Sequence, residues 1–214
     1  LVTQKFQTFC SEDLGGFYLD ILKDRLYTSG ESSLERKSAQ NAMWHITNSL
    51  LRLMAPILSF TADEAWPIFI RDDEDSVLLH TWYEFPQIDQ QLLSKWDHLR
   101  RLRALAQKKL EEKRSAGDIG SSLQAEVSAT ASGQDYDLLT SLQDDSRYLF
   151  LTSSFHLIKG DSPDFLVTAD KSSHQKCERC WHYRSDVGSI VEHETICGRC
   201  VSNLSGGGEQ RQYV

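Results

Sequence analysis

Apolar residues recur at helical spacing through the first thirty residues of the chain. They fall mostly three or four positions apart, which predicts one buried face of an amphipathic helix: Leu1, Val2, Phe6, Phe9, Phe17, Ile21 and Leu22. The segment Thr28-Ser29-Gly30 ends this pattern, and Gly15-Gly16 is predicted to kink the helix. The pattern starts at the first residue without a cap or a Met, which indicates a piece of a longer chain.

Two further helices are predicted before residue 71. Ser32 and Glu35 have the spacing of a capping box, and an apolar stripe follows them: Leu34, Ala39, Ala42, Met43, Ile46, Leu50, Leu53 and Met54. Pro56 suits the first turn of a third helix, with apolar positions at Ile57, Phe60, Ala65 and Trp66. Trp44 and Trp66 lie on these stripes and are predicted to be core residues. The acidic residues 72–75 are predicted to form a loop.

A fourth helix is predicted over residues 88–115. One side is apolar, at Leu92, Trp96, Leu99, Leu102, Ala106 and Leu110. The other sides are basic, at Arg100, Arg101, Arg103, Lys108, Lys109, Lys113 and Arg114. Together the four helices predict a helical-bundle domain over residues 1–116.

The pattern changes to short β-type runs after Gly117. Residues 123–129 alternate between apolar and polar side chains, as in a half-buried strand. Residues 134–143 suit a short helix, and further strand-like runs cover residues 148–151, 155–158 and 165–167. We therefore expect a small α/β domain over residues 117–170. The fold class is mainly α, with this unit between the helical bundle and a C-terminal segment.

Four cysteines dominate that segment, residues 171–214. Cys177, Cys180, Cys197 and Cys200 form two CxxC pairs separated by sixteen residues, which is the spacing of a structural zinc site. The segment has few aliphatic residues, and bound zinc supplies roughly 10–16 kcal/mol of folding free energy in comparable peptides. Two disulfides, or thiols with no partner, are the alternatives to a metal site, and His182 or His193 could replace one cysteine as a ligand. Four metal-type cysteines with one further thiol, Cys10, suit a reducing cytoplasm.

Charge is unevenly distributed along the chain. The net charge is −8, which argues against a general nucleic-acid coat. Residues 95–116, however, carry 8 Lys and Arg against 3 Asp and Glu, a local charge of +5. Residues 171–214 carry 6 against 5, a charge of +1. These two segments are the predicted contact points for a polyanion, unless the basic face is simply solvated.

No catalytic constellation is recognisable in the sequence. There is no phosphate-binding glycine loop, no HExxH and no GxSxG motif. No run of eighteen apolar residues predicts a membrane span, and no basic-then-apolar start predicts a signal peptide. The sequence therefore predicts a binding function for these residues.

Three stretches resemble bacterial-type class I isoleucyl-tRNA synthetases. FCSEDLGGFYLDILKDRLYT and AMWHITNSLLRLMAPILSFTADEAW resemble their helical anticodon-binding domain. IGSSLQAEV resembles the junction motif IGxSLEA, with Gln124 in place of the usual glutamate. CERCWHY and ICGRCVSN resemble the C-terminal four-cysteine zinc finger, which narrows the resemblance from the valine and leucine relatives to the isoleucine enzyme.

This resemblance implies a function for the parent protein and a smaller one for this chain. The parent would use ATP to attach isoleucine to tRNA(Ile) in the cytoplasm. The HIGH and KMSKS signatures and the editing domain are absent here, so this chain would only bind the anticodon arm. The implied cofactor is one structural Zn²⁺, with ATP bound by the parent alone. We expect a monomer that binds neither membrane nor DNA.

Within this frame, particular residues are predicted to touch tRNA. Trp181 offers a face for base stacking, and Arg179 and Arg199 lie within the two CxxC segments. The basic residues predicted to contact phosphates are Lys108, Lys109, Lys113 and Arg114. Alternatively, Trp181 covers the metal site as a small core and the two arginines offset the charge of a zinc tetrathiolate.

Two other functional classes stay open at this point. The zinc finger also resembles that of formamidopyrimidine-type DNA glycosylases, but those enzymes need an N-terminal proline and an adjacent glutamate, and this chain begins Leu1-Val2. The other class is a non-enzymatic zinc ribbon that binds only protein. The salt dependence of tRNA binding separates this protein-binding ribbon from a tRNA-binding chain, because phosphate contacts make the affinity for tRNA fall steeply with salt.

Overall fold

The computed structural model describes residues 1–209, 211 and 213, which form two compact units. The first unit contains Leu1–Arg36 and Gln90–Val214, and the second contains Lys37–Asp89. The helical majority predicted from the sequence is confirmed, together with a small mixed sheet and a four-cysteine cluster. The sequence analysis divides the chain differently, into domains at residues 1–116, 117–170 and 171–214. The boundaries of these two units do not test that division, which stays a prediction.

The first unit begins with one long helical segment. It consists of α1 (Val2–Thr8), the π-helical η1 (Phe9–Leu19) and α2 (Asp20–Thr28). The glycine pair Gly15-Gly16, where a kink is predicted, lies within the wider turns of η1. A Cβ atom on Gly15 would lie 3.1 Å from the carbonyl oxygen of Cys10, five residues earlier, so glycine gives the backbone room there.

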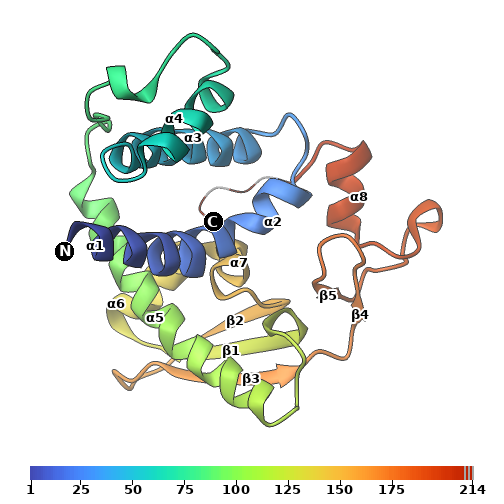
Figure 1. Ribbon diagram of the computed structural model, residues 1–214. Helices are drawn as coiled ribbons and strands as arrows, with labels where there is room; N and C mark the ends of the chain where they lie inside the picture. The colour runs from blue at the N-terminus through green and yellow to red at the C-terminus, as the bar shows by residue number, and fades with distance from the viewer. Residues whose placement is uncertain (210, 212, 214) are drawn as a thin grey trace. The chain divides into compact units, whose positions relative to one another are not determined.

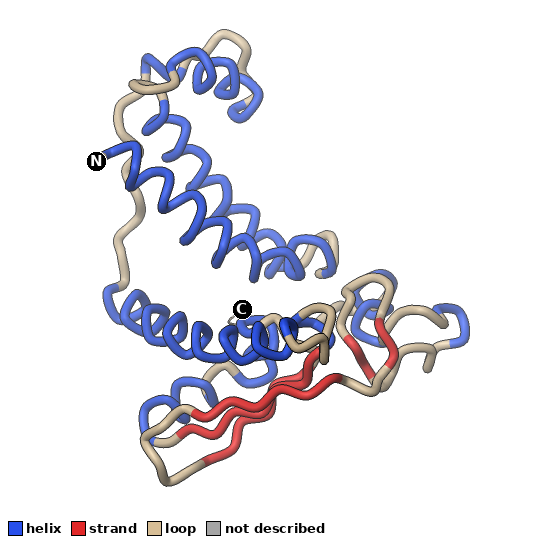
Figure 2. The backbone as a smooth tube through the Cα atoms, turned by 60° about the horizontal axis from the view of Figure 1, so that its bottom comes forward, coloured by secondary structure: helices blue, strands red, loops and turns tan. Residues whose placement is uncertain are grey.

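Helix α5 (Gln90–Ser115) covers one face of a three-stranded sheet (Figure 2). The strand order is β2-β1-β3, with β1 (Ala125–Ala131) parallel to β2 (Ser154–Lys159) and antiparallel to β3 (Leu166–Lys171). Alternate residues of β1 are buried, as its sequence pattern predicts. Leu110 of α5 packs in one cluster with buried residues of this sheet.

Two short helices complete the packing around the sheet. The predicted helix over residues 134–143 is present as α6 (Gly133–Thr140). The strand predicted over residues 148–151 is wrong, because α7 (Ser146–Phe150) is helical there. Its Tyr148, Leu149 and Phe150 are buried together with residues of α2, α5 and α6. Arg103, predicted on the basic side of α5, is also buried and donates from Nε to the carbonyl oxygen of Leu149 at 2.8 Å.

The zinc finger, taken as residues 175–205 from β4 to the end of α8, extends from the sheet toward α2 (Figure 1). It contains a two-stranded antiparallel sheet, β4 (Gln175–Lys176) with β5 (Tyr183–Arg184). Helix α8 (Gly198–Ser205) follows and lies beside α2. The finger has no larger apolar core among the described residues, since its four cysteines pack only with Val187 and Ile196.

The second unit is built from two helices and a short turn. Helix α3 (Leu34–Met54) begins in the first unit and continues into the second, where α4 (Ser59–Ile70) and η2 (Val77–Leu79) follow. The capping residue of α3 is Ser33 and not the predicted Ser32, because its Oγ accepts the Arg36 N–H at 3.2 Å. Pro56 lies in the turn before α4 and does not open that helix.

Trp66 is the centre of the second unit's core. It is 1% exposed, packs with Leu51, Ala62 and Val77, and donates from Nε1 to Asp75 in the predicted acidic loop at 3.0 Å. The prediction that Trp44 is buried is wrong, because its side chain is 45% exposed and stacks on Phe69. None of the helices in the described residues combines the length and the apolar side chains that a membrane span requires.

Candidate metal centre and its docking surface

The four cysteines come from two tight turns. Cys177 and Cys180 lie between β4 and β5, and Cys197 and Cys200 lie at the start of α8. The Trp181 N–H donates to the carbonyl oxygen of Cys177 at 2.9 Å, which closes the first turn. Trp181 has a φ of 67°, so the backbone is left-handed directly after the second cysteine. All four cysteine side chains are buried.

The sulfur positions fit a tetrahedral metal ion. All four Sγ atoms lie within 4.8 Å of one another. The Cys177–Cys200 and Cys180–Cys197 Sγ pairs are each 3.8 Å apart, which is too far for a disulfide bond. A regular tetrahedron with Zn–S bonds of about 2.3 Å has edges of about 3.8 Å. The prediction of a single four-cysteine zinc site is therefore supported by geometry, and His182 and His193 are not members of the cluster.

The electrostatics of the cluster also favour a bound cation. Hydrogen bonds from the Cys180 and Cys200 thiols lower the pKa of Cys197 to about 3. The hydrogen bonds that Cys200 makes to Cys180 and Cys197, together with burial, raise its own pKa far above the usual range. Four crowded sulfurs thus keep some of their protons when no cation is present. A divalent ion would allow all four to ionise, and zinc binding releases those protons.

The finger is docked on the C-terminal end of α2. The Thr28 carbonyl oxygen accepts from Arg179 Nη1 at 2.6 Å and from Asn203 Nδ2 at 2.9 Å. The last carbonyl groups of a helix have no partner within the helix. The finger therefore supplies the missing donors to α2. Arg179, which the sequence predicts as a tRNA contact, is half-buried in this interface.

A buried ion network lies beneath this contact. Asp24 of α2 accepts two hydrogen bonds from Arg199, at 2.9 and 2.8 Å, and a third from Arg211 Nη1 at 2.6 Å. Burial acts to raise the pKa of Asp24, but the hydrogen bond and the positive charge of Arg199 outweigh it and hold that pKa well below its usual range. The carboxylate is ionised, and the network joins α2 to the finger.

Arg199 belongs to this network and not to the outer surface. Its guanidinium also donates to Glu209 at 3.1 Å, and its side chain is 13% exposed. This position does not favour the tRNA contact predicted for Arg199. No local pattern in the sequence indicates Asp24, Glu209 or Arg211 as parts of this network, because Glu209 is ten residues from Arg199 and Asp24 is 175 residues away.

A cleft of about 790 Å³ opens between α2 and the finger. Trp181 and Tyr27 line it with side chains that are 58% and 75% exposed. Lys176 lies with its Nζ 5.2 Å from the centre of the Trp181 ring. The remaining charged lining includes Arg179, Asp24 and Lys23, the last paired with Asp20 at 3.1 Å. The cleft thus combines exposed aromatic faces with positive charge, which is the chemistry that holds unstacked bases and their phosphates.

The basic side of α5 is partly neutralised. Lys109, Lys113 and Arg114 each lie within 3.1 Å of a carboxylate oxygen, from Glu112, Asp118 and Glu111 respectively. Lys108 is exposed and has no ion pair within 4.0 Å among the described residues. Of the four predicted phosphate-contacting residues, Lys108 has the charge most available to a ligand.

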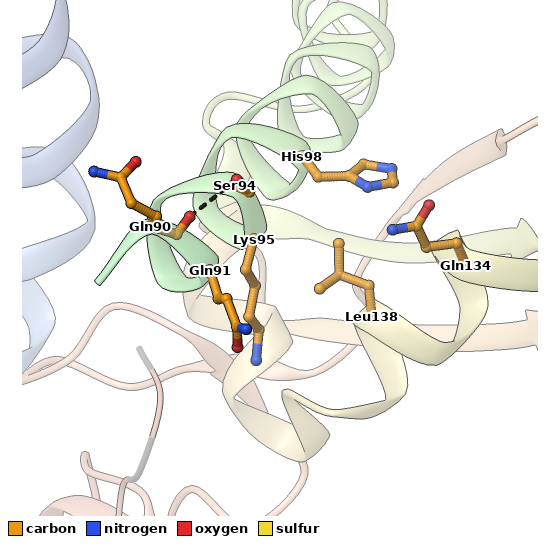
Figure 3. Close-up of a pocket in the computed structure, with 7 residues that line it drawn as sticks. All are labelled: Gln90, Gln91, Ser94, Lys95, His98, Gln134 and Leu138. Atoms are coloured by element: carbon orange, nitrogen blue, oxygen red, sulfur yellow. Dashed lines mark hydrogen bonds between the residues drawn. The ribbon is translucent and has the colours of Figure 1, made fainter. Parts of the chain in front are cut away.

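A second cleft lies at the start of α5 and beside α6 (Figure 3). It measures about 530 Å³ and is lined by Gln90, Gln91, Ser94, Lys95, His98, Gln134 and Leu138. Several of its polar groups are used within the protein, since Ser94 donates to the Gln90 carbonyl oxygen at 2.9 Å and His98 pairs with Asp135 at 2.7 Å. Its lining contains no Trp, Tyr or Phe, and the ring of His98 is held by Asp135, so this cleft is a weaker candidate for base binding than the cleft at Trp181.

Two ranges of the chain match known protein families. Residues 1–129 match the anticodon-binding domain of tRNA ligase, and residues 175–203 match a zinc finger found in FPG and IleRS. The prediction of one structural Zn²⁺ is confirmed by this match together with the four-cysteine cluster. The finger description names two protein classes, so the longer match to residues 1–129 decides between them.

Individual relatives agree with this assignment. The isoleucine--tRNA ligase of Janthinobacterium sp. (strain Marseille) is 54% identical over 219 residues, which cover 100% of this chain and 23% of that protein. The isoleucine--tRNA ligase of Nitrosomonas europaea is 54% identical over 213 residues, covering 96% of this chain and 23% of that protein. The chain thus spans about a quarter of the length of the curated relatives it matches. With residues 1–129 matched and the zinc finger present, the chain belongs to the family of anticodon-binding domains of tRNA ligases.

Proposed function

We propose that this chain is a tRNA-binding part of an isoleucine--tRNA ligase and binds the anticodon arm of tRNA(Ile). The observation that carries the proposal is the cleft between α2 and the finger, where exposed Trp181 and Tyr27 lie beside lysine and arginine side chains. Single-stranded RNA is held by such a combination, because the rings stack on bases while the cations contact phosphates.

The reaction of the whole protein follows from the same proposal. It is the ATP-dependent attachment of isoleucine to its tRNA, carried out by a class I aminoacyl-tRNA synthetase in the cytoplasm. The residues of this chain hold the tRNA and supply no reacting group. In this proposal the chain works as a monomer and does not bind DNA.

The metal has a structural role in this function. We propose that Cys177, Cys180, Cys197 and Cys200 are its four ligands, in agreement with their mutual Sγ distances. Zinc with four thiolates has no open coordination position for a substrate. The ion therefore holds the two turns of the finger and keeps Trp181 at the rim of the cleft.

Binding assays with the 214-residue chain test the proposal. Filter binding with tRNA(Ile) should give saturable binding that weakens steeply between two salt concentrations. A tRNA with a different anticodon should bind more weakly, and duplex DNA of the same length should bind more weakly still. Equal affinity for all three nucleic acids, or no binding to any, would reject the function.

Replacing Trp181 with alanine should weaken tRNA(Ile) binding. Loss of one base-stacking contact costs about 1–3 kcal/mol, which is roughly a 5- to 150-fold increase in Kd. The exposed ring contributes little to folding, so zinc content and the circular dichroism spectrum should not change. Trp181→Phe is the matched control, because it retains an aromatic face and should keep most of the affinity. If Trp181→Ala binds tRNA as the unchanged chain does, Trp181 only covers the metal site.

Replacing Lys108 with glutamine should reduce the salt dependence of tRNA binding. A plot of log K against log salt loses about 0.7–0.9 of slope for each phosphate contact removed. Lys5→Gln on α1 removes the same charge from an exposed position outside the basic side of α5, and it serves as the control. Equal slopes for the two variants would show that this side of α5 is merely solvated.

A further inference from the structure

We propose that the C-terminal segment, comprising the described residues 206–209, 211 and 213, is a clamp that holds the zinc finger on α2. Arg211 is its positioning residue. The proposal rests on the function proposed above for its consequence in tRNA binding, but its structural part is measurable without tRNA.

The segment turns back onto the finger directly after α8. The N–H groups of Gly206 and Gly208 both donate to the carbonyl oxygen of Ser202, at 2.9 and 3.1 Å. Gly208 has a φ of 77°, a left-handed conformation that favours glycine. The Glu209 N–H then donates to Asn203 Oδ1 at 2.8 Å. The chain is thereby directed away from the end of α8 and toward α2.

Glu209 is the first anchor of the segment. Its carboxylate accepts from Arg199 Nη1 at 3.1 Å, from Asn203 Nδ2 at 3.0 Å and from the Tyr148 hydroxyl at 3.2 Å. Arg199 and Asn203 belong to the finger, whereas Tyr148 belongs to α7. One carboxylate therefore connects the finger to the helical part of the first unit.

Arg211 is the second anchor, and it binds the helices on which the finger is docked. It is 7% exposed, and its Nη1 donates to Asp24 Oδ1 at 2.6 Å. Its guanidinium carbon lies 3.5 Å from the centre of the Tyr148 ring, and its backbone N–H donates to Glu35 at 3.1 Å. Farther along, the Tyr213 N–H donates to Asp145 at 2.8 Å. The segment is thus fixed to α2, to the start of α3, to α7 and to the turn before α7.

The finger needs such a clamp because its own contact with α2 is polar. Among the described residues, the apolar cluster of the finger contains no residue of α2. The finger contributes Arg179, Arg199 and Asn203, while the segment adds Glu209 and Arg211 to the same network. Removing one member of a buried polar network leaves its partner buried without compensation, which costs free energy. Without the segment, Arg199 of the finger would lose the Glu209 carboxylate, and Asp24 of α2 would lose the Arg211 guanidinium.

The clamp has a direct consequence for the cleft at Trp181. Part of the cleft lining comes from α2, with Lys23 and Tyr27, and part comes from the finger, with Lys176 and Trp181. The separation of these two parts depends on how the finger is held. Zinc therefore folds the finger, and the clamp positions it for ligand binding.

Arg211→Met tests the clamp, because methionine keeps much of the aliphatic length and removes the charge. Hydrogen exchange of the zinc-loaded chain, read by mass spectrometry, should speed up at least about tenfold at the end of α2 and in α8. Zinc should stay at one equivalent, and Kd for tRNA(Ile) should rise at least about tenfold. Arg211→Lys, which retains the positive charge, should recover part of both effects.

Arg184→Met is the matched control, since the ion pair that Arg184 makes lies within the finger, with Asp186 at 3.8 Å. A chain ending at Ser205 provides a second test in case Arg211→Met is compensated locally, and it should show the faster exchange in full. Unchanged exchange in both clamp variants would overturn the clamp even if Trp181→Ala weakens tRNA binding. Faster exchange with intact zinc would support the clamp even if no variant affects tRNA, in which case the proposed function alone would fail.

Discussion

Cys197→Ser is expected to release the zinc ion and unfold the finger. Serine offers a neutral hydroxyl where the site needs a thiolate, and the other three sulfurs cannot complete the tetrahedron. The finger has little apolar core of its own, because its described apolar cluster adds only Val187 and Ile196 to the cysteines. In zinc-finger peptides the metal supplies about 10–16 kcal/mol of apparent binding free energy, so the folded finger should not survive its loss.

Zinc content by atomic emission and hydrogen exchange by mass spectrometry measure this effect together. The metal should fall from one equivalent to a small fraction, and exchange should accelerate from β4 through α8. The sheet of β1, β2 and β3 should remain protected, because its core is shared with α5 and not with the finger. Cys10→Ser is the control, since Cys10 lies outside the cluster. One equivalent of zinc retained by Cys197→Ser would exclude a site made of four thiolates.

Asp24→Asn is expected to destabilise the chain by about 3–5 kcal/mol, the range found when one partner of a buried ion pair is removed. Asparagine has nearly the same shape, but it cannot balance the charges of Arg199 and Arg211. Both guanidinium groups are largely buried, so water does not replace the lost partner. The finger should loosen from α2 before the rest of the first unit unfolds.

Urea unfolding at saturating zinc gives the free energy of unfolding for this comparison. Asp13→Asn is the matched control, because Asp13 lies in the same helical segment and pairs with Arg100 at a site where both side chains are about two-fifths exposed. Such an exposed pair contributes only about 0–1 kcal/mol. If the two variants lost equal stability, Asp24 would not be the centre of a buried network.

The pH dependence of the same contribution has a defined sign. The pKa of Asp24 is lowered in the folded chain from an ordinary value of 3.8. Its ionised form therefore stabilises the fold at every pH above that value, and the contribution is lost only as the pH falls below it. At neutral pH the network is complete, and the effect of Asp24→Asn is fully expressed there.

Regular patterns in the sequence predict much of the fold. The alternation in β1 and the apolar side of α5 from Trp96 to Leu110 agree with the structure, since each depends on residues that are close along the chain, whereas Leu92 on the same predicted side is 50% exposed. The apolar run at Tyr148 is helical and not a strand, because a run of four residues does not distinguish a buried strand from a buried helix. Leu34 and Phe60 lie on predicted buried stripes but are 80% and 94% exposed.

The candidate site is predictable only in part, and for a related reason. The spacing of the cysteines indicates the metal cluster directly, because the ligands of each pair lie in one turn. Arg199 is held in its buried position by Asp24, which lies 175 residues earlier in the chain. No local pattern carries such a pairing, so an arginine within a CxxC segment resembles a surface residue. Trp181 is identifiable as a candidate because it directly follows Cys180, but its exposure, 58%, comes from the structure.

The ion network at Asp24 also has a consequence for the order in which the protein is made. Asp24 leaves the ribosome 187 residues before its partner Arg211. At ordinary rates of synthesis, about 5–20 residues per second, that interval is roughly 10–40 seconds. Until the finger and Arg211 are synthesised, the carboxylate and the Thr28 carbonyl group lack the partners that they have in the folded chain. The finger must therefore dock late, on a helix that has already been synthesised.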